Sequence, residues 1–263
     1  MISVVLATHN EAKNLPQCLN AVKAWADEII VADGESTDDT VSIAESYQAK
    51  IIFTSNKANF HINKQLAMDA AKFPLVLQLD ADEVVDQELA EFIQNLDKTL
   101  AAKSYQVDAT EPVAWWLKRK NYLLQTWLSK GGQYPDPMIR LYLNGKARLP
   151  HRDVHEQMEV DGSTATAQGH LLHQSSPTFS DYLRKFNAYT DFKAHQLKTQ
   201  NLPINWSNSF NYLIWLPLTT FLKLYLRHRG YVDGLAGLVF ASWSGLHHAL
   251  AYLKLWELYE LES

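Results

Sequence analysis

The chain has 263 residues, of which 20% are charged, and its formal net charge is −5 at pH 7. A chain of this length buries one substantial core, so we expect one α/β domain with a smaller appendage. The negative balance excludes the global basic field that non-specific nucleic-acid binding needs, and no nucleic-acid partner is expected. The single cysteine, Cys18, excludes an internal disulfide and a structural zinc site, and it fits a reducing cytoplasm.

Four short apolar runs, rich in β-branched residues, predict buried parallel strands at 2–7, 28–32, 50–53 and 75–79. Apolar residues at helical spacing predict helices between them, at 15–25, 39–47 and 62–71. This alternation indicates a doubly wound α/β sheet, in which ligands bind beyond the carboxyl ends of the strands. The first run has no basic region before it, so we expect a first strand there rather than a signal peptide.

Polar residues follow the first, second and fourth of these runs, at 8–11, 33–36 and 80–83. Asp80 and Asp82 occupy alternate positions after a strand and so point the same way. Two such carboxylates repel each other unless a cation joins them, and their oxygens suit Mg²⁺ or Mn²⁺ beside a substrate diphosphate. The sequence therefore predicts a metal site at Asp82 and Asp80. The alternative is that Asp82 and Glu83 begin a helix at 84–96, because acids are favoured at helix N-termini.

The loop after the second run is the candidate nucleotide site. Gly34 lets the backbone approach a ligand there, while the Asp33 carboxylate and the Ser36 hydroxyl are able to bind a ribose or a base. Asn10 offers a similar polar group in the first loop, although Asn10 and Ser36 are also candidate helix caps. The chain has no P-loop and no Gly-x-Gly-x-x-Gly, which argues against an ATPase and a dinucleotide oxidoreductase.

Three segments in chain order resemble the inverting family 2 glycosyltransferases of GT-A fold: VVLATHNE at 4–11, VADGESTD at 31–38 and LDADE at 79–83. The resemblance implies a GT-A-like, doubly wound, mainly parallel sheet and a metal-bound nucleotide-sugar donor. It also implies a cluster of donor-binding side chains around the carboxyl ends of the strands.

Individual roles follow from this resemblance. Thr8, Glu11 and Asp33 would bind the nucleotide, Asp80 would lie near the sugar diphosphate, and Asp82 would bind the metal. The complete predicted donor-binding set is Thr8, Asn10, Glu11, Asp33, Ser36, Asn63, Lys64, Asp80 and Arg140. Asn63 and Lys64 match a family position that faces the donor, and the alternative for them is an exposed helix face. Arg140 would clamp the diphosphate with two hydrogen bonds, or else pair with Asp136.

Later segments are similar to a branch of the family that includes lipopolysaccharide-core glucosyltransferases; they lie at 134–136, 140–142, 154–156 and 229–237. This resemblance implies transfer of a hexose, glucose from UDP-glucose, to a glycolipid such as the lipopolysaccharide inner core. We expect a catalytic domain at 1–175, with a nucleotide-sugar half in about 1–100 and an acceptor half in about 101–175, and a helical extension at 176–263. Turn signals between 103 and 173 indicate a mixed-sheet extension.

Inverting transfer needs a base that removes the proton from the acceptor hydroxyl. Glu156 is the first candidate, because His155-Glu156 resembles the acceptor-side motif of that branch, and Asp136 and Asp153 are its rivals. The predicted catalytic set is Glu156, Asp136 and Asp80. The alternative for Glu156 is a surface ion pair with Arg152 or Arg148.

The C-terminal part contains two stretches without Asp, Glu, Lys or Arg, at 206–222 and 234–253. Their apolar residues recur at helical spacing and basic residues flank them, which predicts helices that lie in a membrane interface through 206–253. We therefore expect a cytoplasmic enzyme, peripheral on the inner face of the cytoplasmic membrane. The alternatives are a buried helical pair, an oligomer contact and, third, a membrane span.

Two other function classes fit parts of the pattern. A nucleotidyltransferase also holds nucleotide and metal near carboxylates, but the segment 8–13 lacks the glycine-rich phosphate loop usual in that class. A non-catalytic carbohydrate-binding or scaffold protein would keep its function after alanine substitution of Asp82. The sugar, the acceptor linkage and the oligomeric state are not determined by these motifs.

Overall fold

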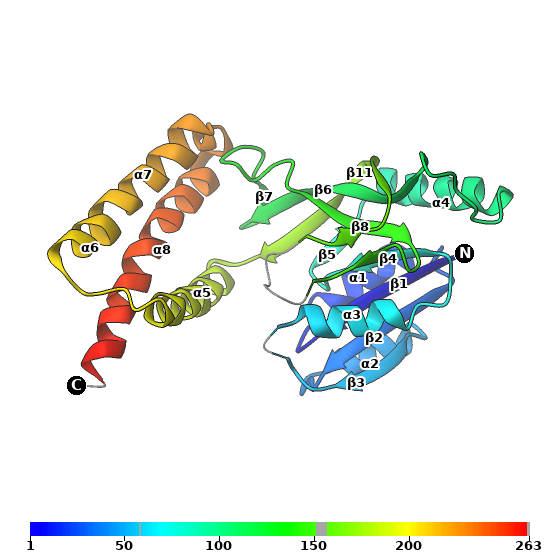
Figure 1. Ribbon diagram of the computed structural model, residues 1–263, viewed down its shortest axis with the longest axis horizontal. Coiled ribbons are helices and arrows are strands. Elements are labelled where there is room, and N and C mark those ends of the chain that lie inside the picture. Colours follow the sequence, from blue (N-terminus) through cyan, green and yellow to red (C-terminus); the bar gives the residue numbers. More distant parts are fainter. Residues whose placement is uncertain (58, 151–156, 262–263) are drawn as a thin grey trace. The chain divides into compact units, whose positions relative to one another are not determined.

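The parallel half of the sheet comes first along the chain. The structure is a computed structural model that describes residues 1–57, 59–150 and 157–261 (Figure 1). Its first elements are β1 (Ile2–Thr8), α1 (Leu15–Val22), β2 (Glu28–Gly34), α2 (Thr40–Ser46), β3 (Lys50–Thr54), α3 (His61–Asp69) and β4 (Leu75–Leu79). These strands pair in parallel in the order β3-β2-β1-β4. The predicted alternation of strands and helices is confirmed, and the carboxyl ends of β1, β2 and β4 lie along one edge.

Antiparallel strands extend this sheet on the β4 side. The next elements are β5 (Glu83–Val85), α4 (Gln87–Ala102), β6 (Pro112–Leu123), β7 (Thr126–Trp127), β8 (Pro137–Leu143), β9 (Ala147–Arg148), β10 (Glu159–Val160) and β11 (Ser163–Ser176). The strand order continues β4-β8-β6-β11-β5, and β8 is antiparallel to both β4 and β6. The sheet is therefore mixed, as the turn signals between 103 and 173 predicted.

The helix expected at 84–96 begins later than predicted. Val84 lies in β5, and α4 starts at Gln87 with Asp86 as its N-cap, whose side chain accepts a hydrogen bond from the Leu89 backbone N–H. Asp82 and Glu83 therefore do not start this helix. The alternative explanation of these two acids as helix-start residues is wrong, because Asp86 provides the cap.

Two apolar clusters, one on each face, hold the sheet in place. Val4 and Leu6 belong to the cluster that includes residues of α1, α2 and α4, whereas Val5 belongs to the cluster that includes residues of α3. Successive strand residues point to opposite faces, so β1, which is covered on both sides, is almost entirely apolar. Burial on both faces fixes the register of the central strands and with it the positions of the loops at their carboxyl ends.

The chain forms two compact units. The first comprises 1–119 and 137–173, and the second comprises 120–136 and 174–263. The boundary predicted at residue 175 divides the chain by function rather than by compactness, and it stays a prediction.

The second unit is mainly helical. It contains α5 (Phe179–Thr199), α6 (Trp206–Phe210), α7 (Leu216–Leu222) and α8 (Gly234–Glu260), with two π-helical turns, η1 (Asn211–Trp215) and η2 (Lys223–Arg227), and a short 3₁₀ turn, η3 (Gly230–Asp233). The elements α6, η1, α7 and η2 follow one another without a break, so 206–227 is one helix. The helix α8 packs against both α5 and α7, as Figure 1 shows.

Close helix packing explains the glycine-rich segment 229–237. Gly237 lies directly against the carbonyl oxygen of Gly230, and a side chain at Gly245 would bring its Cβ within 2.6 Å of the Pro217 carbonyl oxygen. The Asp233 carboxylate accepts hydrogen bonds from the Ser129 backbone N–H at 3.1 Å and the Ser129 hydroxyl at 2.7 Å. This segment therefore holds the 206–227 helix, α8 and the 120–136 segment together. Within the described ranges, no helix is both long and apolar enough to span a membrane.

Candidate active site

Asp33 is held rigidly at the end of β2. Thr8 lies opposite it in the β1–β2 register, and the Thr8 hydroxyl donates to Asp33 Oδ1 at 3.1 Å. The Ser36 backbone N–H donates to Asp33 Oδ2 at 2.9 Å, and the Ser36 hydroxyl to Oδ1 at 2.6 Å. Asp33 is only 2% exposed. The structure therefore brings together three of the predicted nucleotide residues, with the carboxylate in one fixed orientation.

Asn10 joins the first loop to the second. Its backbone N–H donates to the Ser36 hydroxyl at 2.9 Å, and its side-chain oxygen accepts from the Thr37 backbone N–H at 2.8 Å. Its φ of 55° is left-handed, and the N-cap of α1 is Asn14, so the helix-cap alternative for Asn10 is wrong. Glu11 lies beside it and accepts from the Asn14 side chain at 2.8 Å.

Asn63 and Lys64 face inward from α3. They are 5% and 7% exposed, so the alternative of an exposed helix face is wrong. The Asn63 amide donates to the Ser55 carbonyl at 3.0 Å, and a Cβ at Gly34 would lie only 3.2 Å from the Asn63 amide nitrogen. The glycine that ends β2 thus allows α3 to approach the nucleotide loops closely.

A buried ion-pair cluster surrounds Asp80 at the carboxyl end of β4. The Lys64 ammonium pairs with Asp80 Oδ1, and an Arg140 guanidinium nitrogen lies 2.7 Å from Asp80 Oδ2. Arg140 also donates to the Gln78 side-chain oxygen. Arg140 comes from β8, directly beside β4, and Lys64 comes from α3, so three elements converge on one carboxylate. Within the first unit, the carboxylates beside Arg140 are those of Asp80 and Glu83.

Glu83 extends this cluster, although sequence reasoning gave it only a helix-start role. Its side chain is fully buried; one oxygen lies 3.2 Å from Arg119 and 3.5 Å from Arg140, and the other accepts from the Asp80 backbone N–H at 3.0 Å. Glu83 therefore fixes both the backbone of Asp80 and the guanidinium of Arg140. The sequence signal for it, a carboxylate at the start of a short strand, is visible only once 83–85 is known to be a strand.

Burial and charge act in opposite directions on the groups of this cluster. Burial alone would raise the pKa of the Asp80 carboxyl, but Arg140 and Lys64 outweigh it and hold that pKa far below its usual range. Burial lowers the pKa of the Lys64 ammonium, and Asp80 opposes this effect. Lys64, Arg119 and Arg140 lie around the carboxylates of Asp80 and Glu83, and the neighbouring Asp82 also acts electrostatically on Arg140.

Asp82 lies beside a histidine that sequence reasoning missed. Asp82 Oδ2 is 3.4 Å from His173 Nε2, and each side chain is 17% exposed. His173 lies on β11 directly opposite Glu83 in the β5–β11 register. No sequence motif joins the two residues, because the long connection through α4, β6 and β8 separates them. A carboxylate oxygen and an imidazole nitrogen at this spacing suit a first-row divalent cation.

A second acid–histidine group, Asp86, Glu88 and His170, has its ligand atoms within 4.8 Å of one another. Asp86 Oδ1 is already committed, because it accepts from the backbone N–H groups of Leu89 at 2.9 Å and His170 at 3.0 Å. The geometry of this group is that of a helix cap that ties α4 to β11.

The family of the chain follows from comparison with known proteins. Residues 3–157, more than half of the chain, match the family "Glycosyl transferase family 2". The chain belongs to this family. It is therefore a glycosyltransferase, as the three N-terminal segments predicted, and the nucleotidyltransferase alternative is set aside.

Two glycosyltransferases are similar to this chain over most of its length. It is 27% identical over 270 residues to "Lipopolysaccharide core biosynthesis glycosyltransferase LpsC" of Rhizobium meliloti (strain 1021), covering 100% of this chain and 94% of that protein. It is 28% identical over 246 residues to "Uncharacterized glycosyltransferase RP128" of Rickettsia prowazekii (strain Madrid E), covering 90% and 80%. Among solved structures, S. aureus TarS 1-349 in complex with UDP has a TM-score of 0.46 at 14% identity, covering 100% of this chain and 92% of that one.

Of the three candidate bases, the structure describes only Asp136. Glu156 and Asp153 lie outside the described residues. Asp136 belongs to the second unit, where Asn121 donates to its carboxylate at 2.8 Å. Arg148, one suggested partner of Glu156, pairs with Glu159 at 2.7 Å.

Proposed function

We propose that this transferase is an inverting, metal-dependent hexosyltransferase that moves glucose from UDP-glucose to a glycolipid acceptor such as the lipopolysaccharide inner core. The observation that carries the proposal is the buried Lys64–Asp80–Arg140 cluster beside the Asp82–His173 pair. Cationic side chains next to candidate metal ligands suit a leaving nucleotide diphosphate. The relation to a transferase named for lipopolysaccharide core biosynthesis supports the acceptor class.

Asp82 and His173 fit a divalent metal. Both oxygens of Asp80 are engaged by cationic side chains, which makes Asp82 the primary ligand and leaves Asp80, the other predicted ligand, to face the diphosphate. Between the two predicted cofactors, the imidazole favours Mn²⁺ over Mg²⁺. Such a cation would stabilise the negative charge that develops on the departing diphosphate.

The donor is bound by the loops after β1 and β2. The Asp33 carboxylate, fixed by Thr8 and Ser36, accepts hydrogen bonds from the ribose or the base, and Asn10, Glu11 and Asn63 complete the nucleotide side. Lys64 and Arg140 hold the diphosphate. The Nε–H of Arg140 is buried and has no hydrogen-bond partner among the described residues, so it has a donor left for a phosphate oxygen.

The remaining steps belong to the acceptor side. Inversion requires a base on the face of the sugar opposite the diphosphate, and Glu156 takes this role in our proposal, with Asp136 as its rival. A lipid-linked acceptor places the enzyme in the cytoplasm, peripheral on the inner face of the membrane. The catalytic domain is assigned to 1–175 and the membrane-facing extension to 176–263.

Release of nucleotide diphosphate from a panel of nucleotide sugars tests this function. We expect release from UDP-glucose that chelator abolishes, that Mn²⁺ restores and that a detergent-solubilised glycolipid acceptor stimulates. Asp82→Ala should lower the rate roughly 10³-fold, because metal-dependent charge stabilisation is lost. Glu88→Ala is the matched control and should keep full activity.

Two outcomes would contradict the proposal. Release that is insensitive to both chelator and Asp82→Ala would remove the metal from the mechanism. No release from any nucleotide sugar, together with unchanged function of Asp82→Ala in cells, would point instead to a non-catalytic carbohydrate-binding or scaffold protein.

A further inference from the structure

The helix 206–227 exposes a regular row of large apolar side chains. Every fourth residue is between 40% and 86% exposed, and these residues are Trp206, Phe210, Ile214, Leu218, Leu222 and Leu226. We refer to these six residues as the apolar stripe. Contiguous exposed apolar surface of this kind marks an interaction site more often than single exposed residues do.

Two π-helical turns keep the stripe on one side. In a regular α-helix with 3.6 residues per turn, each step of four residues drifts by about 40°, so five steps would rotate Leu226 by about 200° from Trp206. The π-helical turns η1 and η2 take in more residues per turn and counter this drift. Such turns are uncommon and often occur at functional sites, and here they align side chains that a regular helix would spread around its axis.

The other face of the same helix is already used for packing inside the second unit. Tyr212 stacks on Tyr252 with a ring-centroid distance of 5.1 Å, and the Thr220 hydroxyl lies 3.2 Å from His248 Nε2. Pro217 lies against Gly245. The stripe therefore does not hold the helix onto α8, and its exposure has to be explained by a partner.

The charge around the stripe identifies the chemistry of that partner. The segment 206–232 contains three basic and no acidic residues. The whole chain, by contrast, carries 24 basic and 29 acidic residues. Lys223, Arg227 and Arg229 are exposed at the Leu226 end of the stripe. A cationic segment in an acidic protein suits an anionic surface.

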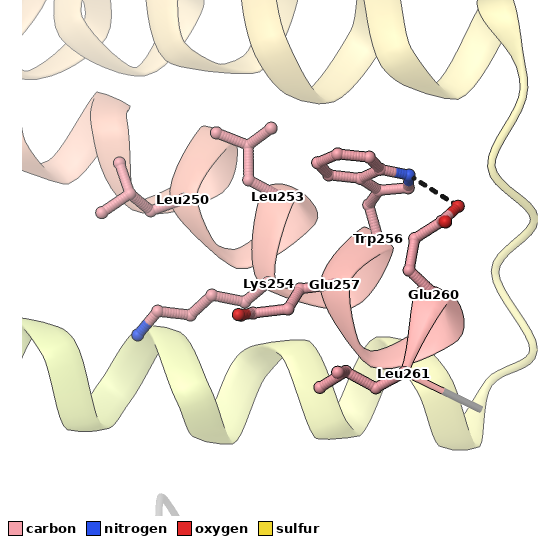
Figure 2. A pocket seen from close by; sticks show the side chains of 7 residues that line it. All are labelled: Leu250, Leu253, Lys254, Trp256, Glu257, Glu260 and Leu261. Carbon is pink, nitrogen blue, oxygen red and sulfur yellow. Dashed lines mark hydrogen bonds between the residues drawn. The ribbon is translucent and has the colours of Figure 1, made fainter. Parts of the chain in front are cut away.

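The second unit also has an apolar hollow, but acidic residues help to line it. This hollow of about 510 Å³ near the C-terminal end of α8 is lined by Leu250, Leu253, Lys254, Trp256, Glu257, Glu260 and Leu261 (Figure 2). Glu260 accepts a hydrogen bond from the Trp256 indole at 3.1 Å at the edge of this hollow. The carboxylates of Glu257 and Glu260 would repel anionic headgroups, so the hollow is not part of the lipid surface.

We propose that the apolar stripe docks the protein onto the surface of an anionic lipid bilayer, with the helix 206–227 lying in the plane of the membrane. Its apolar side chains insert below the headgroups over roughly 30 Å, and its basic end contacts lipid phosphates. This inference rests on the proposed membrane-surface location and names the element and the lipid charge that produce it. In this arrangement α8 supports the docking helix from behind.

Flotation of the full chain with lipid vesicles tests the proposal. The wild type should bind phosphatidylcholine vesicles that contain phosphatidylglycerol roughly tenfold more tightly than pure phosphatidylcholine vesicles, and high salt should remove the difference. The triple change Ile214→Ser, Leu218→Ser, Leu222→Ser should lower binding at least about tenfold, because it removes apolar area from the inserted face. Lys223→Gln with Arg227→Gln should remove most of the preference for phosphatidylglycerol.

The control variant is Tyr189→Ser with Phe192→Ser, two α5 residues that are 61% and 60% exposed and lie off the stripe. This variant should bind vesicles as the wild type does. Equal binding by the stripe variant and the wild type would overturn the proposal. So would a wild type that binds no vesicles but is converted from dimer to monomer by the stripe variant, which would make the stripe a contact between copies.

Donor hydrolysis without lipid separates this proposal from the proposed function. If the stripe variant releases UDP at the wild-type rate and no longer floats, both proposals hold. If the wild type releases UDP but binds no vesicles, only the docking proposal fails. If it binds anionic vesicles but releases no UDP from any nucleotide sugar, only the proposed function fails.

Discussion

The first compact unit buries the charged side chains of Lys64, Glu83 and Arg140, whereas the second leaves large apolar side chains such as Trp206 and Ile214 more than half exposed. Charged groups are rarely buried unless they are paired, and contiguous apolar surface is rarely left in water. Stability alone favours neither arrangement. We assign each one to a proposed function: binding of an anionic donor in the first unit, and contact with a lipid surface in the second.

The buried charges of the first unit and the exposed apolar side chains of the second also differ in how they respond to substitution. A buried ion pair contributes little net stability, but removal of one partner leaves an uncompensated charge in a poorly solvated place. An exposed apolar side chain costs little to replace. Substitutions in the first unit should therefore change stability and activity together, whereas substitutions on the stripe should change only binding.

Glu83→Gln should have the largest effect of the changes considered next. Arg119 and Arg140 would lose their shared carboxylate charge, so we expect a loss of about 3 kcal/mol in the free energy of unfolding. Arg140 would also lose its fixed orientation, which should lower kcat/KM for the donor about 10²-fold. Urea denaturation and UDP release measure the two effects.

Glu91→Gln, at an exposed position of α4, is the control and should change neither quantity. Glu83→Asp should recover part of the stability but little of the activity. The aspartate keeps the negative charge, but its shorter side chain would not hold Arg140 in the same orientation. A Glu83→Gln protein with wild-type kcat/KM would show that Glu83 has only a structural role.

Gly245→Ala tests the packing of the second unit. The added Cβ would lie 2.6 Å from the Pro217 carbonyl oxygen, so the helix 206–227 and α8 would have to move apart. We expect a loss of about 2 kcal/mol in stability, with donor hydrolysis unchanged because the site lies in the first unit. Leu246→Ala, at the neighbouring and 43% exposed position, is the control and should cost much less. A loss of hydrolysis in Gly245→Ala would show that the units are functionally coupled.

The parallel part of the fold was predictable because its signals are local. Each of the strands β1 to β4 is an apolar run covered on both faces, and the helices between them have apolar residues at helical spacing. The start of α4 was misplaced because Asp82 and Glu83 are as acidic as a helix start, while the actual cap, Asp86, follows three residues later. Only the pairing of β5 with β11 distinguishes these arrangements, and that pairing is not local.

The site residues, too, were predictable only where their signals are local. Asp33, Asp80 and Asp82 were predicted because they directly follow buried strands. The inward orientation of Lys64 required the packing of α3, and His173 became visible only when β11 was placed beside β5. Residues that enter a site through long-range pairing leave no signal in the spacing of the sequence.

The smallest predicted effect concerns His247 and His248 in the second unit. Burial lowers the pKa of both imidazoles; His248 and then the ammonium groups of Lys193 and Lys254 add to this for His247, and Lys193 adds to it for His248. The folded state therefore binds fewer protons than the unfolded state, whose histidines titrate near about 6.5. Stability should be constant above pH 7 and should decrease as the pH falls below 6.5.

Thermal unfolding between pH 7.5 and 5 measures this dependence. The decrease should be small, because both residues are only partly buried and water screens their charges. His247→Asn with His248→Asn should flatten the profile, whereas His195→Gln, at an exposed position of α5, should not. A profile that stays unchanged in the double variant would assign the pH dependence to the first unit. The pH dependence of stability would then arise from the buried charges of the first unit. It would not arise from the packing of the helices behind the stripe in the second unit.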